Sequence, residues 1–210
     1  YIQYLKRSFP DTYLSILSNT CFFIDGPLSI NGNAAWLKSS IMKCIYEINS
    51  DLRNNGLAEM MIVGLQNHGK LVDYMRLIKD SVRKNSILAV SDEFRNCYVD
   101  FNKTPSNTTY GNETYYGQDF MLRTASGKTF VFNAPYPFPN KDDIGTFKVE
   151  KSNLSNYPNI GDYVRLIEDF ESDLAENTVV PVALAQKYSA ISLQPGGKVL
   201  DLLAHNAITQ

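Results

Sequence analysis

The sequence predicts an α/β fold in which a mixed β-sheet is flanked by helices, with a helical region at the C-terminal end. Short runs of continuously apolar residues alternate with longer segments that have the periodicity of an amphipathic helix. A hairpin signal follows the third apolar run, and the last part of the chain returns to helical periodicity. The 210 residues suit one domain with a single core.

The first half of the chain alternates between predicted helices and strands. Residues 1–18 are expected to be helical, and the apolar run 21–24 predicts a buried strand that ends at Asp25-Gly-Pro. A second short strand is expected at 28–30. Apolar residues from Trp36 to Leu52 recur at helical spacing, so a helix is predicted between an N-cap at Asn33 and a stop at Gly56.

Further apolar runs and turn signals predict the remaining elements. Runs 60–63 and 87–90 predict strands on either side of a helix over 71–78, and Ser91 or Asp92 is expected to cap a short helix. Ser126-Gly127-Lys128 predicts a hairpin between strands 119–125 and 129–133. A strand is expected at 147–149, followed by helices over 163–174, 182–188 and 199–204. The polar stretch 102–117 is expected to be a mobile loop.

Composition excludes several classes of protein. Lysine plus arginine number 20 and aspartate plus glutamate 22, which excludes a strongly basic nucleic-acid-binding arm but not an enzyme of nucleic acids. Two histidines and three widely spaced cysteines argue against a histidine-rich zinc site and a disulfide framework, so a cytoplasmic location is expected. No segment approaches the roughly 20 apolar residues that cross a bilayer, so no membrane contact is expected. The chain starts at Tyr1, and we expect it to be part of a longer protein.

Three predicted strands end in polar residues, namely Asp25, Gln66 and Asp92. Ligands of open α/β sheets collect at the carboxyl ends of strands, where carboxylates suit Mg²⁺ or Mn²⁺. Such an ion can activate a water molecule and stabilise the charge that develops on a phosphodiester. The alternatives are structural: Asp25 can be a turn residue, Asp92 an N-cap, and Glu93 an acid of the first helical turn. No phosphate-binding loop, dinucleotide motif or serine-hydrolase motif is present.

Aromatic and basic side chains add a weaker indication of nucleic-acid binding. Tyr110, Tyr115 and Tyr116 could stack on bases, although packing explains them equally well. Five basic residues in and around the predicted helix over 71–78 could contact phosphates, although a solvated surface is the commoner meaning of such a face. These residues are Lys70, Arg76, Lys79, Arg83 and Lys84.

Four segments, taken in order, resemble the NurA family of nucleases. Phe-Phe-Ile-Asp-Gly-Pro-Leu at 22–28 is similar to the family's first acidic strand end. Ile-Val-Gly-Leu-Gln-Asn-His-Gly at 62–69 is similar to its second segment, and Leu-Ala-Val-Ser-Asp at 88–92 to its third. Pro-Val-Ala-Leu-Ala-Gln at 181–186 is similar to its late helix. The resemblance covers about residues 22–203.

The resemblance implies an RNase H-like fold and a DNA nuclease that depends on Mn²⁺ or Mg²⁺. It also implies a homodimer that works with a HerA-like hexameric ATPase, in DNA repair by end processing or in defence against phages. Position by position, Asp25 matches the first catalytic acid and Asp92 a later one. Gln66 stands where the family has a glutamate, and Gln186 where it has a histidine.

These two departures leave three alternatives open. Glu93 or another acid could supply the missing charge, and His205, which also follows Leu-Ala, could replace the family histidine. Otherwise the chain is a degenerate scaffold that binds DNA or the ATPase without cleaving, because glutamine offers neither an anionic ligand nor a titratable nitrogen. An unrelated domain that binds a small molecule is the remaining hypothesis.

Overall fold

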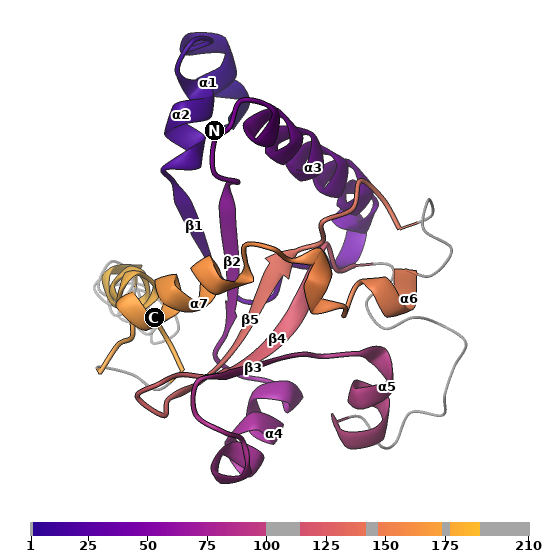
Figure 1. Cartoon of the computed structure of the whole chain (residues 1–210), viewed down its shortest axis with the longest axis vertical. Coiled ribbons are helices and arrows are strands. Elements are labelled where there is room, and N and C mark those ends of the chain that lie inside the picture. The colour runs from indigo at the N-terminus through magenta and orange to yellow at the C-terminus, as the bar shows by residue number, and fades with distance from the viewer. Residues whose placement is uncertain (1, 100–113, 142–146, 174–176, 190–210) are drawn as a thin grey trace, which may run out of the picture.

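The computed structural model describes residues 2–99, 114–141, 147–173 and 177–189. It contains a five-stranded mixed sheet with helices packed on both faces (Figure 1), so the predicted α/β class is confirmed. The strand order is β1–β2–β5–β4–β3. The strands are β1 (Cys21–Asp25), β2 (Met61–Gln66), β3 (Ser86–Ala89), β4 (Gly117–Arg123) and β5 (Thr129–Pro135).

Strand direction decides which strand ends lie together. β1 and β2 are parallel, whereas β5 is antiparallel to β2, and β4 is antiparallel to both β5 and β3. β1 and β3 therefore form opposite edges of the sheet and run in opposite directions. The pairing register places Ala89, at the end of β3, in the same row as Asp25 and Leu65, but β2, β5 and β4 lie between β1 and β3.

The β4–β5 hairpin confirms the signal at Ser126-Gly127-Lys128. The amide of Thr124 donates to the carbonyl of Lys128 at 2.9 Å, and the amide of Gly127 donates to the carbonyl of Thr124 at 3.0 Å. Gly127 has φ +98°, a backbone conformation that favours glycine. Long-range pairing then places β5 in the middle of the sheet, next to β2.

The helices largely follow the predicted periodicity. The α-helices are α1 (Ile2–Ser8), α2 (Tyr13–Ser18), α3 (Lys38–Asn54), α4 (Lys70–Ile78), α5 (Asp92–Phe94), α6 (Phe147–Glu150) and α7 (Ile160–Asp169). Shorter helical turns are η1 (Gly32–Leu37), η2 (Lys79–Ser81), η3 (Arg95–Val99) and η4 (Leu154–Asn156). A further helical stretch covers 180–189.

Three local predictions are wrong. Residues 147–149 lie in α6 rather than in a strand, because Phe147 packs against Tyr136 and Phe138 instead of pairing with the sheet. Residues 28–30 form only a single bridge, between Ser29 and Tyr115. The helix after Asn33 begins as η1 and becomes α-helical at Lys38, which leaves Trp36 74% exposed rather than on the buried face.

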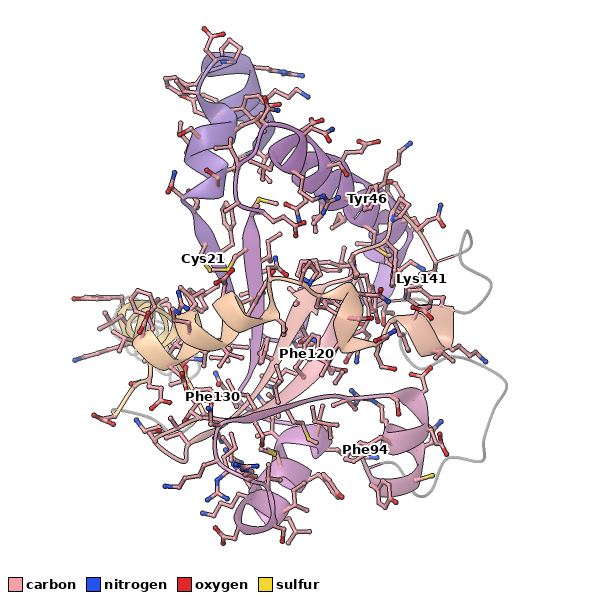
Figure 2. The ribbon with its side chains drawn as sticks, viewed as in Figure 1. Cys21, Tyr46, Phe94, Phe120, Phe130 and Lys141 are labelled. Atoms are coloured by element: carbon pink, nitrogen blue, oxygen red, sulfur yellow. The ribbon has the colours of Figure 1, made fainter. Side chains whose placement is uncertain are left out.

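Helices on the two faces of the sheet bury different side chains. On one face, Tyr163 and Ile167 of α7 join the cluster that contains Val63, Phe120 and Phe132. On the other face, one cluster holds α4 residues and another holds α3 residues. The α4 cluster contains Leu71, Val72, Met75, Met121 and Val131, and the α3 cluster contains Ile45, Leu52 and Ile62. Figure 2 shows side chains filling the space around the central strands, with Phe120 and Phe130 labelled.

Parts of some predictions lie outside the described residues. These are most of the expected mobile loop 102–117, the expected helix 199–204, Tyr110 and His205. The described end of the loop region enters the sheet at Gly117, where β4 begins. Within the described ranges, no helix is both long enough and apolar enough to span a membrane.

Candidate functional site

Asp25 ends β1 with its carboxylate exposed and held by two side-chain amides. Asn67 Nδ2 donates to Oδ1 at 3.1 Å, and Gln186 Nε2 donates to Oδ2 at 2.7 Å. The chain turns away at Gly26, which has φ +124° and donates its amide to the carbonyl of Leu65 at 2.8 Å. Two predicted site residues, Asp25 and Gln186, are therefore in contact although 161 positions separate them.

A pocket of about 570 Å³ opens beside this carboxylate, between β1 and the helical stretch 180–189. We call it the Asp25 pocket; its lining residues are Cys21, Phe23, Asp25, Pro181, Val182, Ala185, Gln186 and Ser189. Cys21 lies on β1 (Figure 2), and burial raises the pKa of its thiol to about 12. The thiol therefore stays protonated at neutral pH, which argues against a nucleophilic role.

Gln66 belongs to a different cluster, on the opposite face of the sheet. Leu65 pairs directly with Asp25 and shares its face, so the next side chain along β2 points to the other side. Gln66 Nε2 donates to Asp119 Oδ1 at 2.6 Å and to Asn133 Oδ1 at 3.0 Å. Asn133 Nδ2 also donates to Asp119 Oδ1, at 2.6 Å.

Asp119 is buried and neutralised by a cation. Its Oδ2 forms an ion pair with the guanidinium of Arg95, and each of the two side chains is 7% exposed. An isolated carboxylate would be costly at such a position, whereas the guanidinium and two amides satisfy it here. Asp119 is thus held by three side chains, and its Oδ1 already accepts two hydrogen bonds.

Asp92 lies in the same region and is also paired with a buried cation. Lys151 Nζ donates to Asp92 Oδ1 at 2.6 Å, while Asp92 Oδ2 has no hydrogen-bond partner. Burial lowers the pKa of Lys151, and the bond to Asp92 opposes that shift. The cap of α5 is Ser91, whose Oγ accepts from the amide of Phe94 at 3.1 Å. The structure therefore assigns the cap to Ser91 and an ion pair to Asp92.

The charges of these groups act on one another across the buried and half-buried side chains of this face. Burial, followed by the charges of Asp119 and Asp92, raises the pKa of Tyr136 well above its ordinary value. The charge of Asp119 likewise acts on Lys151. We call this unit the Asp119 cluster; it comprises Gln66, Asp92, Arg95, Asp119, Asn133, Tyr136 and Lys151.

Asp25 and Asp92 are the residues that the sequence predicts as ligands of one Mn²⁺ or Mg²⁺ site at the strand ends, and the expectation that they converge is wrong. The three strands do end near one row of the sheet, but β3 lies at the far side of the sheet from β1. Four strand spacings of about 4.8 Å separate the two edge strands by roughly 19 Å. Asp25 is held by Asn67 and Gln186, whereas Asp92 is paired with Lys151, so the two carboxylates do not converge on one ion or on a pair of ions about 4 Å apart.

Neither cluster has a donor set that fits Mn²⁺ or Mg²⁺. In the Asp119 cluster, Arg95 and Lys151 already compensate the two carboxylates. At Asp25, both neighbouring amides present hydrogens to the carboxylate rather than oxygens to a metal. Within the described ranges, no three side chains of His, Cys, Asp or Glu gather into a group that could hold a metal ion. Glu93 is exposed on α5 and joins neither cluster.

The sequence reading missed Asp119, Arg95 and Lys151. The sequence offers one indication of this cluster: Asp119 stands within Gln-Asp-Phe-Met-Leu, a run that otherwise has the pattern of a strand. A charge in a buried strand needs a partner, but the sequence does not say that Arg95 supplies it from 24 positions away. No family model matches the chain, and no curated protein or solved structure matches it. The residue contacts described above therefore carry the functional argument.

Proposed function

We propose that the chain is a non-cleaving scaffold of RNase H-like type, a degenerate counterpart of the NurA nucleases, which binds DNA without hydrolysing it. One observation carries the proposal: the residues at the positions of the nuclease acids occupy two separate clusters on opposite faces of the sheet. Asp25 contacts Asn67 and Gln186, whereas Gln66 contacts Asp119.

Metal-assisted hydrolysis requires carboxylates that converge on one or two ions. Gln66 contributes no charge and uses its amide on Asp119. Asp92 and Asp119 are compensated by Lys151 and Arg95, so neither is available as an uncompensated anionic ligand. Metal-assisted hydrolysis of DNA, which the resemblance implies, thus lacks a set of anionic metal ligands in this arrangement.

The contact between Asp25 and Gln186 supports the position-by-position match to the family. The resemblance assigns these positions to the first acid and the late histidine, and their side chains are hydrogen-bonded at 2.7 Å. The same contact favours the competing proposal, a nuclease centred on Asp25. The cleavage experiment below separates the two proposals.

The basic segment 70–84 supports DNA binding. It carries five basic and two acidic side chains, and it forms α4, η2 and the approach to β3. Arg76 pairs with Asp73, whereas Lys79, Arg83 and Lys84 are exposed and form no ion pair within the described part of the chain. Such a local concentration of cations can hold a phosphate backbone even in a protein that is near neutral overall.

Cleavage is tested with linear double-stranded and single-stranded DNA in the presence of Mn²⁺, with and without a HerA-like ATPase. We expect no cleavage by the wild-type protein under any of these conditions. The matched variant is Asp25→Asn, which keeps the shape of the side chain and removes its charge. Cleavage by the wild type that disappears in Asp25→Asn would establish the nuclease and overturn the scaffold.

Binding is tested by fluorescence anisotropy with a short DNA duplex at several salt concentrations. The double variant Arg83→Glu and Lys84→Glu is expected to bind at least about tenfold more weakly, with a shallower dependence on salt. The control is Lys43→Glu on α3, an exposed lysine outside the basic segment. Equal weakening by both variants, or no binding by the wild type, would refute DNA binding through this segment.

The resemblance also implies a homodimer and a HerA-like partner, and both belong to the same proposal. A dimer is expected to appear as a doubled mass in light scattering. Co-elution with the purified ATPase tests the partner directly. A monomer that does not co-elute would remove both elements from the proposal without affecting the DNA-binding test.

A further inference from the structure

The Asp25 pocket combines a single uncompensated carboxylate with an uncharged wall. Asp25 forms no ion pair within the described part of the chain, and its two described side-chain partners are neutral amides. This differs from the Asp119 cluster, in which both acids have a cation. The negative charge of Asp25 is therefore available to a ligand.

The two amides orient this carboxylate without saturating it. Asn67 donates to one oxygen and Gln186 to the other, so each oxygen keeps a second acceptor position. Asn67 follows the end of β2, and Gln186 belongs to the helical stretch 180–189, which lines the pocket opposite β1. A donor that approaches from the pocket meets an acceptor whose position is already fixed.

The rest of the wall is apolar or neutral. Phe23, Pro181, Val182 and Ala185 supply hydrocarbon surface. The thiol of Cys21 is protonated, because burial raises its pKa to about 12. Among the described residues of the lining, Asp25 is the one charged side chain, and it would repel phosphates and carboxylates.

We propose that the Asp25 pocket binds a small organic cation, with a primary ammonium or guanidinium group on Asp25 and an alkyl stem against Phe23 and Val182. The head group has the donors that the two oxygens can accept, and the stem covers the hydrocarbon wall. A guanidinium can engage both oxygens at once, whereas an ammonium presents three donors from one point. Binding of this cation requires neither the basic segment 70–84 nor a metal ion.

The probes are n-butylammonium and n-butylguanidinium, titrated into the full chain with EDTA present so that no metal takes part. Binding is followed by two-dimensional NMR. We expect shifts of the amide signals of β1 and of the stretch 180–189 for both cations. The uncharged isostere butan-1-ol is expected to bind about two- to fivefold more weakly, which is the range that an exposed charge pair contributes.

Three variants make the outcome decisive. Asp25→Asn keeps the fold and is expected to bind both cations no better than butan-1-ol. Ala185→Phe, on an exposed position of the pocket wall, is expected to abolish binding of the cations and of the alcohol alike. Asp51→Asn, an exposed acid on α3, is the matched control and is expected to bind as the wild type does.

Equal affinity for butylammonium and butan-1-ol would overturn the proposal, as would unchanged cation binding by Asp25→Asn. Shifts that are lost in Asp51→Asn as well would show a non-specific charge effect and would also overturn it. None of these results bears on the cleavage assay, which depends on metal, or on the DNA titration, which depends on segment 70–84.

Discussion

The contact between Gln66 and Asp119 shows what an amide does at a position where the resembling family has a carboxylate. A glutamate at position 66 would place a second carboxylate against Asp119, whereas the glutamine amide donates to it at 2.6 Å. The resemblance alone marks Gln66 as a lost metal ligand. The contact shows in addition that the amide of Gln66 satisfies an oxygen of the buried Asp119 carboxylate.

Gln66→Glu is therefore expected to destabilise the protein at neutral pH by about 2 kcal/mol. The neighbouring charge of Asp119 raises the pKa of the new carboxyl in the folded state. Stability is then retained below the ordinary glutamate pKa, near 4.3, and lost as the pH rises through the raised value. Thermal unfolding at a series of pH values measures this difference between variant and wild type.

The matched control is Gln186→Glu, which makes the same change beside Asp25 on an exposed surface. Solvent screening limits that cost to about 0.5 kcal/mol. A loss at position 66 no larger than at position 186 would contradict the role given to the buried amide. Stabilisation of the Gln66→Glu protein by Mn²⁺ would indicate that this single substitution is enough to create a metal site.

Lys151→Met tests the buried ion pair with Asp92. The variant leaves Asp92 without its only described partner, and the expected loss of stability is about 3 kcal/mol. Adding Asp92→Asn is expected to restore part of that loss, because the uncompensated charge is removed. Urea denaturation of both single variants and the double variant measures the coupling. Additive losses in the double variant would show that the pair is not coupled.

At the scale of elements, the turn after β1 packs onto the sheet through glycine positions. A Cβ on Gly64 would lie 2.8 Å from the carbonyl oxygen of Gly26 and 3.0 Å from Cγ of Leu28. Leu28 is fully buried, so it cannot move aside easily. The close approach holds the 26–28 turn, and with it Asp25, against β2.

Gly64→Ala is accordingly expected to cost about 1–3 kcal/mol through overpacking. The control is Gly161→Ala in α7, where an added Cβ meets no atom within 4 Å. Alanine is the better helix former, so the control is expected to be neutral or slightly stabilising, by at most about 1 kcal/mol. Chemical denaturation gives both values. A Gly64→Ala protein as stable as the control would show that the turn adapts freely.

At the scale of the whole molecule, buried tyrosines make the fold sensitive to alkali. Burial raises the pKa of Tyr136, Tyr157 and Tyr163 above the ordinary tyrosine value. A phenol whose folded pKa is raised contributes stability that is present below the unfolded pKa, near 10, and lost as the pH rises through the folded value. The lowered pKa of Lys151 acts in the opposite direction but concerns one residue.

We therefore expect cooperative unfolding above about pH 10, with the buried phenols ionising only as the fold opens. Circular dichroism and phenolate absorbance, recorded together, test this coincidence. Tyr136→Phe is expected to move the midpoint to higher pH, because one raised group is removed. Full ionisation of the tyrosines with native circular dichroism would rule out the mechanism.

Much of the local structure could be predicted because periodicity is a local property. The apolar run before Asp25, the helix over 71–78 and the hairpin at Gly127 all follow from neighbours in the chain. Errors arose where a distant contact decided the outcome. Residues 147–149 read as a strand, yet Phe147 packs on Tyr136 and Phe138, and no strand partner is left for that segment.

The sequence by itself determined the α/β class, most of the elements and the candidate positions Asp25, Gln66, Asp92 and Gln186. Only the tertiary structure decided which of these positions meet. Strand order is fixed by pairing between distant segments, and the placement of β3 at the far edge of the sheet separates Asp92 from Asp25. The tertiary structure also decided that Arg95 pairs with Asp119 and Lys151 with Asp92. A buried carboxylate needs a cation beside it, and only the fold determines which cation lies there.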